Sequence, residues 1–116
     1  MTNKKIIKQA DELYLKGNAF NDRGDYGLAE EAFLKALVYY TKATEWEKVV
    51  ACEMSIGNVC CNKNRFEDAV EHWGNALKIY EQSNLFTEAG ELCLTIGDLY
   101  YDQKVTTEPS DFLITT

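Results

Sequence analysis

The apolar positions of this chain recur every three or four residues, which is the spacing of one face of an α-helix. They follow it from Asn3 to about Phe20, and turn-forming residues then occupy positions 21–25. A second helix begins after Asp25, whose side chain we expect to cap it, and Gly24 suits the left-handed backbone that ends a helix. The first forty residues therefore predict a hairpin of two helices.

The same pattern returns forty residues later. Thr44 and Glu47 have the spacing of a capping box, which predicts the start of a third helix. A turn at 62–65 separates this helix from a fourth, and a fifth runs from about Leu85 to Asp102. We therefore expect an all-α fold of five helices, in which hairpins repeat with a period of forty residues.

A glycine lies in the middle of the first helix of each repeat, at Gly17, Gly57 and Gly97. Glycine inside a helix costs about 1 kcal/mol relative to alanine, so its recurrence needs a physical reason. Without a Cβ, this helix can approach its partner closely, and the bulky Phe33 or Trp73 then fills the space nearby. We expect the three glycines to have equivalent surroundings.

These residues resemble the tetratricopeptide repeat, a helix hairpin with small, aromatic, glycine and alanine residues at fixed positions. The matching residues are Gly17, Phe20, Gly24, Tyr26, Ala29 and Ala36 in the first repeat, and Gly57, Cys60, Asn64, Phe66, Ala69 and Ala76 in the second. The resemblance implies a right-handed α-solenoid of antiparallel helix hairpins, with five helices in two and a half repeats. The usual period is 34 residues. The forty-residue repeats also resemble those of the polarity adaptors, which have a Leu-Gly-Asn phrase and couple G-protein subunits to spindle factors. Here the leucine is replaced by Lys16, Ile56 and Ile96, and the last asparagine by Asp98.

The pattern also predicts the domain boundaries. A helical repeat domain is expected over 1–102, with repeats at about 10–43 and 50–83 and a half repeat at 90–102. Residues 103–116 contain a proline and several β-branched residues, which favour an extended or disordered tail.

The resemblance implies a concave groove lined by the first helix of each hairpin. Side chains at helical spacing on these helices share one face. We expect the groove to bind a peptide or helix of a partner protein, through asparagine hydrogen bonds and apolar contacts along its floor. The predicted groove residues are Tyr14, Leu15, Asn18, Asp22, Met54, Ser55, Asn58, Asn62, Leu94 and Asp98. A solvated polar face without a ligand is the alternative interpretation.

The fifth helix predicts a second function, because apolar residues surround much of it and no sixth helix completes the repeat. The chain would then be a small structural subunit that self-associates, as a homodimer, or docks through this helix. The predicted assembly face consists of Leu92, Ile96, Leu99 and Tyr100.

The formal charge of −7 argues against binding to nucleic acid, which requires clustered Lys and Arg side chains. It favours a protein or peptide partner that is neutral or basic rather than an acidic C-terminal peptide. Chaperone cofactors of the tetratricopeptide family hold such carboxylates with groove cations, and the matching positions here have none. No apolar run is long enough for membrane insertion and no export signal is visible, so we expect a cytoplasmic location.

No motif for enzymatic chemistry stands out. The chain has neither a glycine-rich phosphate loop nor a recognisable nucleophile, and its cysteines and its histidine, His72, lack metal-ligand spacing. We expect no catalytic residue, no metal and no cofactor. Cys52, Cys60 and Cys93 fall where small buried residues are needed, which predicts reduced thiols in the core.

Overall fold

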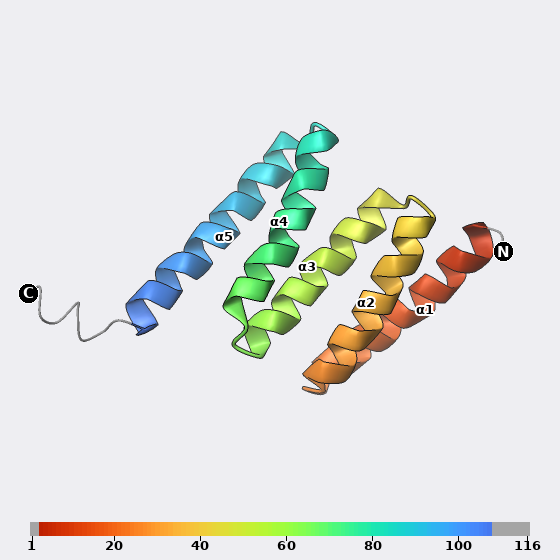
Figure 1. Ribbon diagram of the computed structural model, residues 1–116, viewed down its shortest axis with the longest axis horizontal. Coiled ribbons are helices and arrows are strands. Elements are labelled where there is room, and N and C mark those ends of the chain that lie inside the picture. Colours follow the sequence, from red (N-terminus) through yellow and green to blue (C-terminus); the bar gives the residue numbers. More distant parts are fainter. Residues whose placement is uncertain (1–2, 108–116) are drawn as a thin grey trace, which may run out of the picture.

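The computed structural model describes residues 3–107, with the side chains of residues 3–102, and every element in that part of the chain is a helix (Figure 1). The helices are α1 (Asn3–Asp22), α2 (Tyr26–Lys42), α3 (Trp46–Asn62), α4 (Phe66–Gln82) and α5 (Phe86–Thr107). The predicted all-α fold of stacked helix hairpins is confirmed. Helix α5 continues past the expected end at Asp102, and the rest of the predicted tail lies outside the described residues.

The chain reverses direction at four turns of one kind, spaced twenty residues apart. Each has one residue with a positive φ, namely Gly24, Thr44, Asn64 and Asn84. At the first turn the amide of Asp25 donates to the carbonyl of Phe20 (2.8 Å) and that of Gly24 to Asn21 (3.0 Å), which is a Schellman motif. Helices α2, α3 and α4 each have seventeen residues, and three turn residues follow each helix, which makes a unit of twenty. Two such units, one hairpin, make the forty-residue period.

The turns correct two expectations about capping. Thr44 does not cap α3: it has a φ of 55°, and Glu45 occupies the N-cap position without a side-chain cap. Asp25 does precede α2, but its side chain makes no capping hydrogen bond. Backbone hydrogen bonds of the Schellman motifs, and not side-chain caps, therefore connect the helices at both turns. The predicted left-handed conformation of Gly24 is confirmed, with a φ of 80°.

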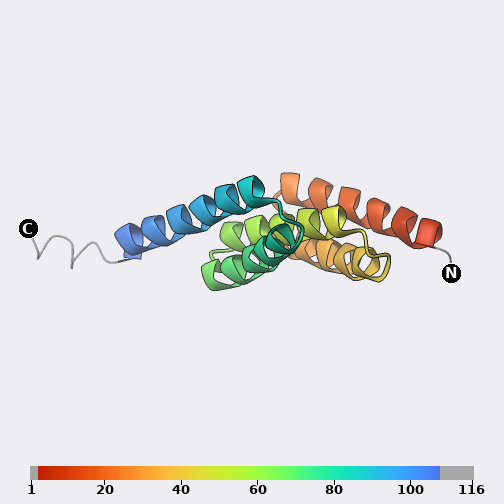
Figure 2. The ribbon, with the colours of Figure 1, turned by 90° about the horizontal axis from the view of Figure 1, so that it is seen from above.

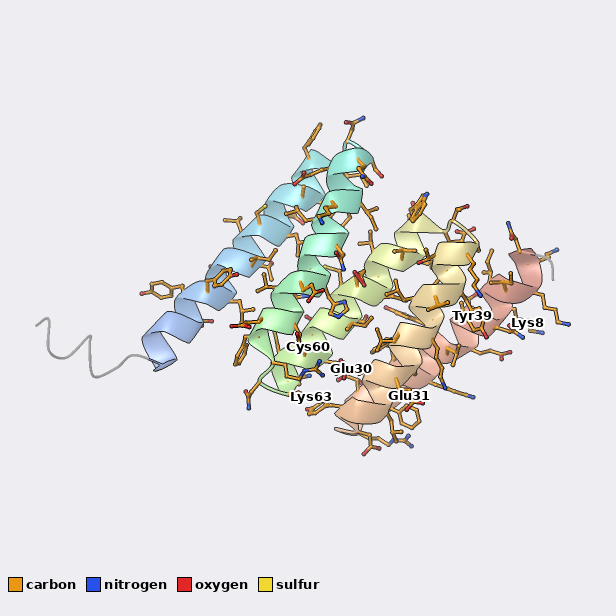
Figure 3. All side chains as sticks on the ribbon, viewed as in Figure 1. Lys8, Glu30, Glu31, Tyr39, Cys60 and Lys63 are labelled. Carbon is orange, nitrogen blue, oxygen red and sulfur yellow. The ribbon has the colours of Figure 1, made fainter. Side chains whose placement is uncertain are left out.

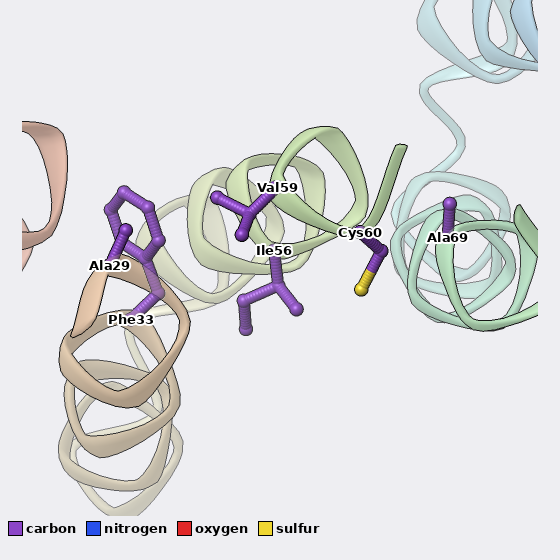
Figure 4. Close-up of a cluster of buried hydrophobic side chains, with 6 residues drawn as sticks. All are labelled: Ala29, Phe33, Ile56, Val59, Cys60 and Ala69. Atoms are coloured by element: carbon purple, nitrogen blue, oxygen red, sulfur yellow. The ribbon is translucent and has the colours of Figure 1, made fainter. Parts of the chain in front are cut away.

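The helices form two layers, with α1, α3 and α5 on one side and α2 and α4 on the other (Figure 2). The core lies between the layers and is built from small and large side chains in alternation. Its central cluster joins α2, α3 and α4 through Ala29, Phe33, Ile56, Val59, Cys60 and Ala69 (Figure 4). A second cluster around Tyr40 and Cys52 lies towards α1, and a third around Trp73 and Leu92 lies towards α5.

Close helix crossings at two of the glycines are confirmed. A Cβ placed on Gly17 would stand 2.6 Å from a ring carbon of Phe33, and one on Gly57 would stand closer still to the indole of Trp73. That indole also donates a hydrogen bond of 3.3 Å from Nε1 to the carbonyl of Met54. Each ring thus occupies the space that a side chain on its glycine would need.

Gly97 does not share this environment, which contradicts the expectation of three equivalent glycines. No atom outside its own helix neighbourhood lies within 4 Å of a Cβ built there. The reason is topological: α2 and α4 supply the rings that cover Gly17 and Gly57, and among the described residues no helix follows α5.

Candidate functional site

The predicted groove residues belong to α1, α3 and α5, and we call the surface that they form the common face. Two side-chain contacts join α1 to α3 across it. The hydroxyl of Tyr14 lies 3.2 Å from Oγ of Ser55, and Nδ2 of Asn62 donates to Oδ1 of Asn21 at 3.5 Å. The ring of Tyr14 also packs on Phe33, with centroids 5.4 Å apart. The floor of the face is therefore held together by its own side chains.

The remaining predicted groove residues differ in how far they are available to a partner. Leu15 and Leu94 are 67% and 71% exposed, and Asn58, Asp22 and Asp98 are also exposed. Met54 and Asn18 are half-buried, and Met54 packs against the cluster of Trp73 and Leu92. The face thus offers a partner two exposed leucines, the exposed Asn58 and two carboxylates.

Most of the predicted assembly face packs inward, which corrects that assignment. Leu92 is buried, and Ile96 and Leu99 pack against the cluster around Trp73. They follow the same helical stripe that Cys52, Ile56 and Val59 use in α3. The exposed large apolar side chains of α5 are instead Phe86 at its start and Leu94, Tyr100 and Tyr101, so only Tyr100 of the predicted set is among them.

The cysteines are as expected at two of the three predicted core positions. Cys52 and Cys60 are buried free thiols, whereas Cys93 is exposed. The counterpart of Cys93 in α3 is Glu53, which α4 covers, and among the described residues no helix follows α5 to do the same. Burial raises the pKa of Cys52 to about 12, and the carboxylate of Glu53 adds to the effect. Cys52 is therefore a protonated packing residue and not a nucleophile.

Two charged clusters were not anticipated. Glu30 of α2 pairs with Lys63 (3.2 Å) and Arg65 (2.9 Å) at the end of α3, near the thiol of Cys60 (Figure 3). Burial pushes the pKa of Glu30 upward, but the hydrogen bond from Lys63 and the charge of Arg65 outweigh it and lower the pKa. This ion pair closes the contact between successive hairpins.

The second cluster joins the two helices of one hairpin. Glu53 is only 3% exposed, and its Oε1 lies 3.2 Å from Nδ1 of His72. The hydrogen bond to Glu53 raises the pKa of His72 against the opposing effect of burial. The sequence signal was available, because Glu53 interrupts the apolar stripe of its helix. His72 is thus a structural boundary residue.

The described residues contain no group of side chains that could hold a metal ion. None of the helices in the described part of the chain is long and apolar enough to cross a membrane. Cavities of about 170 and 180 Å³ lie beside α4, and neither is lined by a predicted groove residue.

Two comparisons with known proteins give similarities. A family model for the soluble NSF attachment proteins matches residues 2–110. Protein kinesin light chain-related 2 of Arabidopsis thaliana is 27% identical over 96 residues, which cover 81% of this chain. The chain spans only 14% of the length of that protein. No solved structure matches the chain significantly. These findings support helical repeats of the tetratricopeptide type, while the closer kinship with polarity adaptors stays a prediction.

Proposed function

The chain belongs to the soluble NSF attachment protein family, and from that premise we propose that its common face binds a segment of a partner protein without catalysing a reaction. The observation that supports this proposal most is that Leu15 and Leu94 are exposed on the common face. The hydrogen bond between Tyr14 and Ser55 already holds α1 and α3 together across that face. A preorganised surface loses little conformational freedom on binding. The exposed leucines supply apolar contact, and Asn58 supplies both a donor and an acceptor for a peptide backbone.

The charge of the face favours a neutral or basic partner. Asp22 and Asp98 are exposed on it, and the sequence from Phe86 to Asp102 contains no Lys or Arg. A carboxylate of a bound peptide would meet like charges there, which disfavours an acidic C-terminal peptide. A cytoplasmic location is part of the proposal, and the reduced thiols of Cys52 and Cys60 support a reducing compartment.

The family name describes attachment to the protein NSF, so NSF is the partner to test first. Leu15→Ser combined with Asn58→Ala removes exposed contacts without touching the core, whereas Met54 is unsuitable because it packs inside. We expect binding to purified NSF to weaken about tenfold or more, since a buried leucine contributes about 2 kcal/mol. Leu28→Ser on α2, whose side chain is 50% exposed, is the matched control and should keep parental affinity. An unchanged affinity of the double variant would refute the common face as the binding site.

A second candidate function, assembly through α5, is supported by the side of this helix that no other described helix covers. Gly97 has no covering ring, and Leu94, Tyr100 and Tyr101 are exposed around it. Tyr100 also lines the cavity of about 180 Å³ against the start of α4. On this alternative the chain is a structural subunit that docks or self-associates, including as a homodimer, through α5.

Sedimentation velocity separates the two functions. Assembly through α5 predicts a concentration-dependent rise in sedimentation coefficient that Tyr100→Ser with Tyr101→Ser abolishes and that the Leu15 and Asn58 double variant leaves intact. A parent chain that sediments as a monomer at high concentration would exclude self-association through this helix.

A further inference from the structure

A cavity of about 170 Å³ opens at the edge of the molecule where the turns before α3 and α5 lie (Figure 1). It lies between the start of α3 and the end of α4 and is mostly apolar. Its lining residues are Trp46, Glu47, Val50, Ile79, Tyr80, Ser83 and Leu85. The volume is well below the roughly 300–1,000 Å³ of pockets for drug-sized ligands and suits a single large side chain.

The corresponding positions of the first repeat are filled, so the two repeats differ at this cavity. The counterparts of Tyr80 and Ser83, forty residues earlier, are Tyr40 and Ala43, and both are buried. Tyr40 also donates a hydrogen bond to the carboxylate of Asp11. The position that corresponds to Asp11 is Ala51, so the second repeat lacks this acceptor.

Tyr80 is consequently a half-buried phenol whose hydroxyl has no hydrogen bond to any described residue. Burial raises the pKa of Tyr80, and the carboxylates of Glu88 and Glu91 raise it further. Glu47 lines the cavity itself, and Glu88 and Glu91 lie near enough to Tyr80 to act on its hydroxyl, so the cavity has carboxylates in and beside its lining. Large apolar side chains gather at the same edge, since Trp46 is 50% exposed and Phe86 is 67% exposed.

We propose that this cavity, lined by Trp46, Val50 and Tyr80, binds one large apolar side chain of a partner protein that is flanked by Lys or Arg residues. The apolar walls take up the aliphatic or aromatic group, and Glu47 and its acidic neighbours pair with the flanking cations. A second copy of the chain fits less well, because it carries a net charge of −7 and would approach the carboxylate of Glu47. The site lies near the turns before α3 and α5, and none of its lining residues belongs to the common face.

The two tryptophans make the proposal directly testable by NMR. Trp46 lines the cavity, while Trp73 is buried in the core and serves as an internal control in every spectrum. The probe is the capped peptide acetyl-Gly-Lys-Leu-Lys-Gly-amide, titrated into ¹⁵N-labelled full-length chain. We expect the indole signal of Trp46 to shift with saturation in the millimolar range, while the Trp73 signal stays in place. A peptide with alanine instead of leucine should bind about tenfold more weakly.

Matched peptides and variants test the charge and the cavity separately. The peptide with Glu in place of both Lys residues should cause no saturable shift, and raising the salt concentration should weaken the Lys peptide. Glu47→Gln should lower the affinity, whereas Glu12→Gln on the exposed surface of α1 should not. Ser83→Leu should obstruct the cavity and abolish the Trp46 shift, with an unmoved Trp73 signal reporting an intact fold.

Three results would overturn the proposal. The first is the absence of a saturable Trp46 shift with the Lys peptide. The second is an equal response to the Glu peptide, which would remove the role of the carboxylates. The third is a Trp46 signal that moves with protein concentration alone, which would assign the cavity to a second copy of the chain.

Discussion

Substitution of Gly57 by leucine tests the packing on which the stacked hairpins depend. The new side chain would have to enter the space that the Trp73 indole occupies, and it would displace the hydrogen bond from that indole to the carbonyl of Met54. Overpacking of a core costs about 1–3 kcal/mol, and a lost hydrogen bond adds about 1 kcal/mol. The better helix propensity of leucine returns only about 0.8 kcal/mol. We expect a net loss of about 1–3 kcal/mol.

Gly97→Leu is the matched control, because the residue has the same repeat position and open space around its Cβ direction. Only the propensity gain applies there, so the variant should be more stable by about 0.5–1 kcal/mol. Urea unfolding followed by circular dichroism at 222 nm measures both variants. In thermal melts the Gly57 variant should unfold about 5 °C or more below the parent. Midpoints that shift equally in the two variants would refute the close-crossing explanation.

Three further predictions concern single side chains. The hydrogen bond to the buried Glu53 raises the pKa of His72 above its usual 6.5. The pair therefore stabilises the folded state fully below pH 6.5, and this stabilisation is lost as the pH rises through the pKa of His72 in the folded state. Stability in urea should therefore fall from pH 6 to pH 8 in the parent and less in His72→Gln. Tyr40→Phe should cost about 1.5–3 kcal/mol in chemical unfolding, because its hydroxyl bonds a carboxylate. Tyr80→Phe should cost almost nothing. Because burial raises the pKa of Cys52 to about 12, a disulfide reagent at pH 8 should label Cys93 rapidly and Cys52 only after unfolding, as mass spectrometry would show.

The helices could be predicted well from the sequence, because each of them buries one row of apolar side chains that recur every three or four residues. It failed at Thr44, since a β-branched residue rarely adopts positive φ and a nearby Glu47 imitated a capping box. Thr44 lies twenty residues from both Gly24 and Asn64, and this spacing would have assigned it to a turn, because the turn is set by backbone hydrogen bonds and not by one residue type. The shorter period was therefore the stronger signal.

The candidate sites were harder to predict because they depend on which neighbours exist. Leu92 could have been assigned to the core by comparison with Cys52, its counterpart in α3. The open space at Gly97 follows from the absence of a helix after α5 in the described chain. The sequence pattern already predicted that no sixth helix completes the repeat, and the expectation of three equivalent glycines did not take this into account. The cavity beside Tyr80 arises from a difference between two repeats, and only a residue-by-residue comparison of Asp11 with Ala51 points to it.

The length of the helices keeps the two proposed binding sites apart. At about 1.5 Å per residue, a helix of seventeen residues is about 25 Å long. Val50 lines the cavity near one end of α3, whereas Asn58 and Asn62 lie on the common face towards the other end. Substitutions this far apart without shared partners have additive effects on free energy. A loss of partner binding caused by Asn58→Ala should therefore be independent of Glu47→Gln, so each variant reports on its own surface.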